Sequence, residues 1–113
     1  MKSKIHLQKL EDYSLDRVEQ FVRDSLDILD PEASMFSPGQ KVLLKPNLLR
    51  GFKPERCVTT HPVVVEAVCR VLKDLSVGQI VISDSPALGS LSAVADKAGY
   101  GLLEKNMAPR SCP

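Results

Sequence analysis

Three short polar segments of the chain contain residue types that bind anions, hold cations or transfer protons. They contribute, in chain order, Lys45, Asn47, Thr59, Thr60, His61, Asp84 and Ser85. An ammonium group and the first amides of a helix attract phosphate or carboxylate groups, whereas a carboxylate or an imidazole binds a cation or exchanges a proton. These residue types therefore predict a site for a small anionic molecule, with acid–base chemistry as its catalytic form.

The order of these segments along the chain suggests that they meet at one edge of a sheet. Residues 41–45 and 79–84 are apolar runs bounded by turn formers and are predicted strands, and a helical pattern begins between them. In an open parallel sheet, ligands bind beyond the carboxyl ends of the strands. In this hypothesis Lys45 balances the charge of an anion, the amides near Thr60 bind it, and Asp84 holds a cation or moves a proton.

Each of these residues also has a purely structural interpretation. Thr60 or His61 would then only cap the helix that follows, and Lys45 would be a solvated strand end. Asp84 would form a turn by accepting hydrogen bonds from the amides after it. No spacing rule joins His61, Asp84 and Asn47 into a metal site, so the catalytic candidates, Asp84 and His61, carry no metal prediction.

Composition restricts the class of protein. The chain has 113 residues, of which 43% are hydrophobic and 26% charged, and this is ordinary for one small globular domain. A formal net charge of +1 gives no support to a nucleic-acid partner. The longest apolar runs are far shorter than the roughly 20 residues of a membrane span, so we expect a soluble, cytoplasmic protein without a membrane partner.

The cysteines and the common nucleotide and hydrolase motifs give no further site. Cys57, Cys69 and Cys112 match no zinc or iron–sulfur spacing, and Cys69 lies in a helical apolar pattern as a small buried hydrophobe would. A reactive thiol at Cys57 or Cys112 is the functional alternative. The sequence contains no GxGxxG, GxxxxGK[ST], GxSxG or HExxH motif.

Alternating strand and helix patterns predict an α/β fold with three-layer βαβ units and a mostly parallel sheet. The predicted elements are a strand over 5–10, a helix after Ser14 that ends near Pro31, a strand over 41–45, a helix from Pro62 to Gly78, a strand over 79–84 and a helix over 91–98. The two later strands are apolar throughout, as strands buried on both sides are. Residues 1–113 are thus expected to form a single domain with about three strands and three helices.

A fourth strand would be the next element in this order, and its absence makes the predicted sheet incomplete. The chain is therefore expected to be the N-terminal part of a longer domain. An alternative function follows from the same observation: a non-catalytic interaction module whose exposed strand edge pairs with another protein or with a second copy.

The segments KVLLKPNLL (41–49), VTTHPVVVEAVCRVLKD (58–74) and IVISDSPALG (80–89) resemble the domain of unknown function 362 family over about residues 38–105. In that family a strand ending in KPN, a T-x-P-type helix start and a strand ending in D-S-P-G occur in this order. Ala87 stands here at the position of the usual glycine, and Gly89 follows two positions later.

The resemblance implies no established reaction. Family members are often longer, and many carry an appended ferredoxin-like module with two four-iron clusters. The three cysteines of this chain do not fit the cluster motif, so a four-iron cluster is implied by family association alone, and the cofactor stays unknown. A small anionic ligand remains the partner predicted from the residues themselves.

Overall fold

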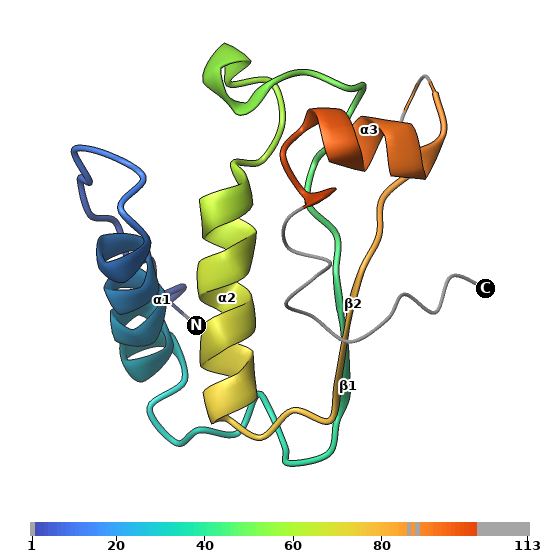
Figure 1. The fold of residues 1–113 in the computed structure, drawn as a ribbon. Helices are drawn as coiled ribbons and strands as arrows, with labels where there is room; N and C mark the ends of the chain where they lie inside the picture. The colour runs from blue at the N-terminus through green and yellow to red at the C-terminus, as the bar shows by residue number, and fades with distance from the viewer. Residues whose placement is uncertain (1, 86, 88, 102–113) are drawn as a thin grey trace.

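The computed structural model describes residues 2–85, 87 and 89–101, and it has an α/β architecture (Figure 1). Its elements are α1 (Leu15–Leu29), β1 (Lys41–Leu44), the single 3-10 turn η1 (Pro54–Arg56), α2 (Pro62–Asp74), β2 (Gln79–Ile82) and α3 (Leu91–Lys97). β1 and β2 are parallel, with Lys41 opposite Gln79 and Leu44 opposite Ile82. The connection between them is the βαβ crossover through α2 that the sequence predicts.

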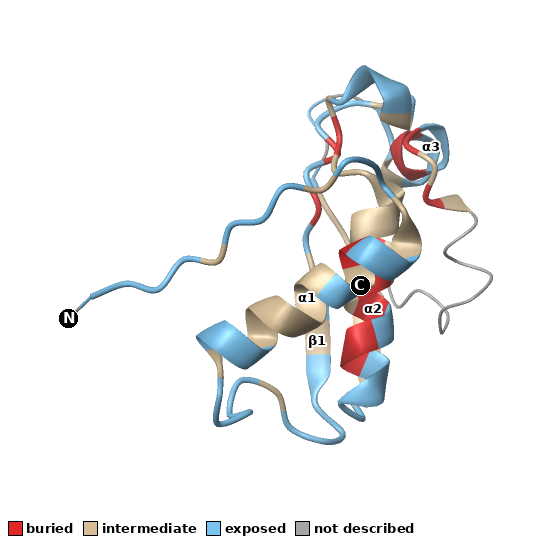
Figure 2. Ribbon diagram, turned by 90° about the vertical axis from the view of Figure 1, so that its left-hand side faces the viewer, coloured by how far each residue is buried: buried red, intermediate tan, exposed pale blue. Residues whose placement is uncertain are grey.

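The helices and the sheet are stacked in the order α1, α2, sheet, and α3 lies across the end at which the strands finish (Figures 1 and 2). α1 packs on α2. Arg23 donates to Glu19 at 2.6 Å and to Asp74 at 2.5 Å, and Arg70 lies 3.0 Å from Glu66, so ion pairs line the exposed side of this helix pair. Such exposed pairs contribute little to the stability of the fold.

The predicted strand over residues 5–10 is wrong, because this segment pairs with neither strand. Ile5 and Leu7 are 85% and 91% exposed, and Figure 2 shows the N-terminal segment extending away from the helices. Within this segment, His6 stacks on Phe21 of α1 and hydrogen-bonds Ser25 Oγ at 2.7 Å, and Lys9 pairs with the neighbouring Glu11 at 3.0 Å. Alternating side chains give a segment two faces, but a strand also needs a neighbouring edge for its backbone groups.

The expectation that both strands are buried on both sides is also wrong for β1. Leu43 is 63% exposed, while Val42 and Leu44 on the opposite face are partly buried. The reason is the stacking order: α1 covers α2, and within the described part of the chain no helix covers the second face of the sheet. The apolar composition of β1 therefore does not show that a second layer is present.

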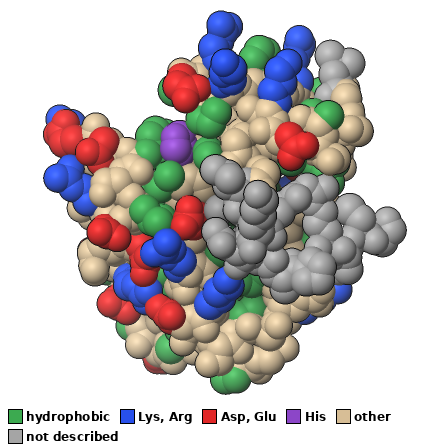
Figure 3. Space-filling model, viewed as in Figure 1, with side chains coloured by type: hydrophobic (Ala, Val, Ile, Leu, Met, Phe, Trp, Pro, Cys, Tyr) green, Lys and Arg blue, Asp and Glu red, His purple; other side chains and the backbone are tan. Residues whose placement is uncertain are grey.

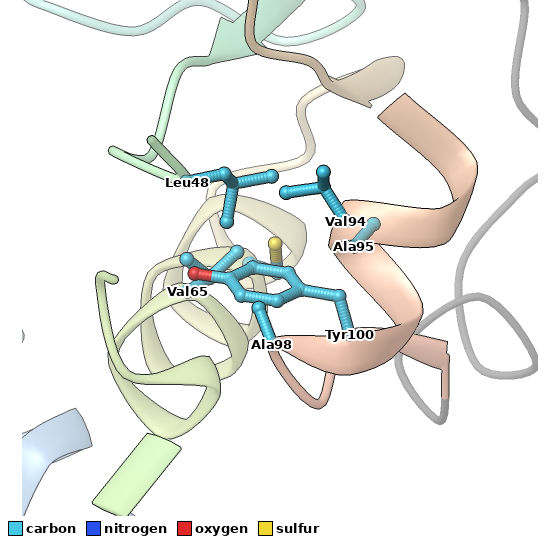
Figure 4. Packing of buried hydrophobic residues seen from close by; sticks show 7 residues of the cluster. Leu48, Val65, Val94, Ala95, Ala98 and Tyr100 are labelled. Atoms are coloured by element: carbon cyan, nitrogen blue, oxygen red, sulfur yellow. The ribbon is translucent and has the colours of Figure 1, made fainter. Parts of the chain in front are cut away.

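The main core lies between α2, α3 and the loop that follows β1 (Figure 4). Its buried members are Leu48, Val65, Cys69, Val94, Ala95, Ala98 and Tyr100. Cys69 is 2% exposed, and burial raises the pKa of its thiol to about 12, so it behaves as the small hydrophobe that the helical pattern predicted. Cys57 is exposed, and Cys112 lies outside the described residues. Among the described helices, none is long and apolar enough to cross a membrane.

Substitutions at Leu48 and Leu49 test which part of the loop after β1 contributes to the core. Leu48 is 1% exposed in the cluster, whereas its neighbour Leu49 is 44% exposed. Leu48→Ala is expected to lower the free energy of unfolding by about 2–5 kcal/mol, because it leaves a cavity among packed side chains. Leu49→Ala, the matched control, is expected to cost less than about 1 kcal/mol. Urea unfolding followed by circular dichroism measures both; equal losses would contradict this account of the core.

Candidate functional site

The carboxyl ends of β1 and β2 and the start of α2 converge at one edge of the sheet, as predicted (Figure 1). The loop after β1 is joined to the segment before α2 by two hydrogen bonds. The amide of Asn47 donates to Thr60 Oγ1 at 3.0 Å, and the amide of Thr60 donates to the Asn47 carbonyl at 2.9 Å. Thr60 therefore fixes the loop backbone, and its hydroxyl oxygen already accepts one bond.

Lys45 and Asp84 meet directly across the ends of the two strands. Lys45 Nζ lies 2.6 Å from Asp84 Oδ1, and the side chain of Asp84 is only 4% exposed whereas that of Lys45 is 66% exposed. The second carboxylate oxygen, Oδ2, accepts a hydrogen bond from the amide of Leu48 at 2.9 Å. One buried carboxylate thus holds both an exposed ammonium group and the loop after β1.

These donors keep Asp84 ionised. The hydrogen bond from Lys45 is the largest cause that lowers the pKa of Asp84, burial opposes it, and the amides of Leu48 and Ser85 lower it further. Asp84 is therefore a charged acceptor that is already occupied. This arrangement suits a group that positions Lys45 better than one that gives or takes a proton.

Tyr100 belongs to the same region, and sequence reasoning did not find it. The residue is 3% exposed in the buried cluster (Figure 4). Its hydroxyl donates to the Thr60 carbonyl at 2.7 Å. Burial raises the pKa of the Tyr100 hydroxyl, and the charge of Asp84 acts in the same direction, so the phenol remains protonated as a donor. Tyr100 follows Gly99, beyond the helical pattern, and no motif marks it.

His61 caps α2, which is the structural alternative that the sequence left open. Its Nδ1 accepts from the amide of Val63 at 3.2 Å, and its carbonyl accepts from the amide of Val64 at 3.0 Å. Pro62 has no N–H to offer. The first amides of α2 are therefore occupied by the helix's own cap and do not point freely at a ligand.

Tyr13 stacks on the His61 ring, with the ring centroids 3.8 Å apart and the planes within 6°. Burial lowers the pKa of His61, and the nearby charge of Glu55 opposes this shift. Because Nδ1 is an acceptor, the ring proton belongs on Nε2, which is then a donor. No hydrogen bond joins His61 to Asp84 in the described chain.

The remaining candidates differ in exposure. Asn47 and Ser85 are exposed at the edge, whereas Thr59 is 7% exposed and its hydroxyl has no hydrogen-bond partner among the described residues. A buried hydroxyl without a partner is unusual in a folded protein. The described residues contain no group of three or more His, Cys, Asp or Glu side chains arranged to hold a metal ion.

The region that matches a known protein family contains all three polar segments of the candidate site. Residues 42–110 match a family described as Domain of unknown function (DUF362). The chain is 36% identical over 100 residues to the thylakoid-associated protein sll1697 of Synechocystis sp. (strain ATCC 27184 / PCC 6803 / Kazusa). The match includes 88% of this chain and 31% of that relative, so the chain spans about a third of the relative's length. No solved structure matches the chain.

Asp84 should make stability depend on acid pH. Its pKa is lower in the folded chain than the ordinary value of 3.8, so its contribution is present above that value and is lost as pH falls through the folded pKa. Asp84→Asn is expected to cost about 1–3 kcal/mol at neutral pH, because Lys45 and the Leu48 amide lose a charged acceptor. Urea unfolding between about pH 5 and pH 2 measures this effect: the free energy of unfolding should change less with pH for Asp84→Asn than for wild type.

The matched control for Asp84 is Asp27→Asn, because Asp27 forms no ion pair or hydrogen bond within the described chain. This variant should keep the wild-type acid profile. If both variants flattened the profile equally, the ion pair with Lys45 would not be its origin.

His61 should add a second pH dependence at higher pH. Its folded pKa lies below the ordinary value of 6.5, so stability is full above 6.5 and falls as pH drops through the folded pKa, when the ring must charge and release the Val63 amide. His61→Asn keeps a cap acceptor and does not titrate. Melting temperatures between about pH 8 and pH 5 should fall for wild type and much less for this variant; equal slopes would contradict this assignment.

Proposed function

The chain belongs to the DUF362 family, a domain of unknown function, and from its strand-end geometry we propose that it binds a small anionic molecule through the ammonium group of Lys45. The observation that supports this proposal is the contact between Lys45 Nζ and the buried carboxylate of Asp84 at 2.6 Å. An ammonium group has three donors, and Asp84 occupies one of them. The other two remain at an exposed position beyond the strand ends.

Fixing the ammonium group before a ligand arrives favours binding. A free lysine side chain loses rotamer freedom when it closes on a ligand, and this loss subtracts from affinity. Asp84 also accepts a hydrogen bond from the Leu48 amide, so the ammonium group is held in position relative to the backbone at both strand ends. We therefore assign Lys45 to ligand binding and Asp84 to positioning.

The other polar groups at this edge would set the shape of the ligand. Asn47 and Ser85 are exposed there, and His61 Nε2 offers a further neutral donor. Thr59 is the one predicted site residue whose buried hydroxyl lacks a partner in the described chain. A ligand with two or more oxygens, such as a carboxylate or a phosphate, would use the exposed donors of Asn47 and Ser85 together with Lys45.

The catalytic form of this site remains a proposal for a longer protein. In the described arrangement both carboxylate oxygens of Asp84 accept hydrogen bonds and His61 Nδ1 accepts the Val63 amide, so neither group could take a proton from a substrate without first losing one of these bonds. A four-iron cluster needs four thiolates, whereas the described cysteines are a buried Cys69 inside the core and an exposed Cys57. These two residues do not fit such a cluster. A cytoplasmic location remains a separate prediction, made from composition.

A second candidate function is protein pairing through the sheet. Leu43, 63% exposed on the face of β1, is the observation that favours it. Pairing along an open strand edge would extend the sheet, and a layer of the partner packed on the same face would cover Leu43.

The proposal is tested by thermal unfolding with inorganic phosphate, pyrophosphate, citrate and nucleotides. A ligand at about 100 times its Kd adds roughly 2.7 kcal/mol, which raises the melting temperature of a domain of this size by roughly 10 °C or more. Lys45→Ala should abolish this shift. Lys41→Ala, at the opposite end of the same strand, removes an equal charge and should leave the shift unchanged.

The two candidate functions give different outcomes in this experiment. An anion shift that survives Lys45→Ala would exclude the proposed site. A concentration-dependent dimer by light scattering, without any anion shift, would favour pairing through the sheet instead.

A further inference from the structure

The loop between β1 and α2 holds two arginines on one aromatic ring. The guanidinium carbon of Arg50 lies 6.0 Å from the centroid of the Phe52 ring, and that of Arg56 lies 5.8 Å from it. Both arginines are exposed, and Lys53 between them is exposed as well. Cation–π contacts at such distances stabilise each guanidinium group without neutralising its charge.

These two arginines differ from the others in the described chain. Arg17, Arg23 and Arg70 each lie within 4 Å of at least one carboxylate. By contrast, Arg50, Arg56 and Lys53 form no ion pair with any described carboxylate. Residues 50–56 hold three positive charges and one carboxylate, that of Glu55, so an excess of two positive charges remains, and an anionic partner would relieve their repulsion.

The loop is fixed to the rest of the fold at several points. Leu48 is buried in the core, and the Leu49 carbonyl accepts a hydrogen bond from the Ala87 amide at 2.6 Å. A Cβ atom on Gly51 would lie 3.0 Å from Lys97 Cδ, so the side chain of Lys97 from α3 packs against this loop and adds a fourth cation. Lys and Arg side chains gather at this end of the molecule, at the top of Figure 3.

An apolar side chain accompanies these charges. Leu49 is 44% exposed in the same loop, and the Phe52 ring is partly exposed. Basic and apolar side chains on one protruding surface are typical of segments that rest at the interface of a membrane with anionic lipids. We call Leu49, Arg50, Phe52, Lys53 and Arg56 the basic loop.

We propose that the basic loop binds the surface of a membrane that contains anionic lipids, with the arginines and Lys53 contacting headgroup phosphates and carboxylates and Leu49 entering the interface. The segment between β1 and α2 lies at one end of the molecule (Figure 1), so a flat surface can contact it. Nucleic acid fits less well, because binding a duplex requires basic groups along an extended footprint, whereas α1 and α2 carry mixed ion pairs. This inference is independent of the anion site at Lys45.

Co-sedimentation with vesicles tests the proposal. The full 113-residue chain should sediment with vesicles of equimolar phosphatidylcholine and phosphatidylserine, and not with phosphatidylcholine alone. Arg50→Gln together with Arg56→Gln should weaken binding about 30-fold, since each basic side chain near an anionic surface contributes roughly a factor of five. Added salt should weaken wild-type binding.

The matched control removes the same charge elsewhere. Lys2→Gln together with Lys4→Gln changes two exposed lysines in the N-terminal segment and should leave vesicle binding unchanged. Circular dichroism confirms that the helices of each variant are retained. Equal weakening by both double variants would show that only net charge matters and would overturn the proposal. So would an absence of wild-type binding to anionic vesicles, or tighter binding to a single-stranded oligonucleotide.

Discussion

The carboxylate of Asp84 is the constraint on which the strand-end edge depends. It is almost completely buried, so its charge must be compensated, and Lys45 and the Leu48 amide provide that compensation. Both donors come from the segment that follows β1. One side chain after β2 therefore decides where the chain goes when it leaves the neighbouring strand, and Leu48 enters the core as a result.

The same constraint connects packing to the proposed site. Once Leu48 is fixed, the next residues are directed out of the core, which exposes Leu49 and Arg50. Thr60 holds Asn47 from the other side, and Tyr100 holds the Thr60 carbonyl. Residues that are 13 to 40 positions apart thus share one hydrogen-bonded edge. A substitution that loosens the core at Leu48 would also displace Lys45, because Lys45 and the Leu48 amide bind the same carboxylate.

The elements that could be predicted from sequence were those whose pattern is local. α1 and α2 follow from apolar side chains at helical spacing, and β1 and β2 from short apolar runs bounded by turns. The segment 5–10 could not be judged in this way, because a strand depends on a neighbour that alternation does not reveal. The role of Tyr100 was equally invisible, since it arises from a fold that brings the residue to Thr60 across 40 positions.

The candidate site shows the same division between local and long-range information. Lys45 and Asp84 were predicted at one edge from strand order alone, and they do meet there. What the sequence could not decide was whether the helix amides or the lysine would face a ligand. In the structure the His61 ring accepts the Val63 amide and Pro62 has no N–H, so the first turn of α2 is capped by its own residues, which favours the lysine in the proposed function. An anion at this edge would therefore be bound by a side-chain charge that Asp84 holds in place.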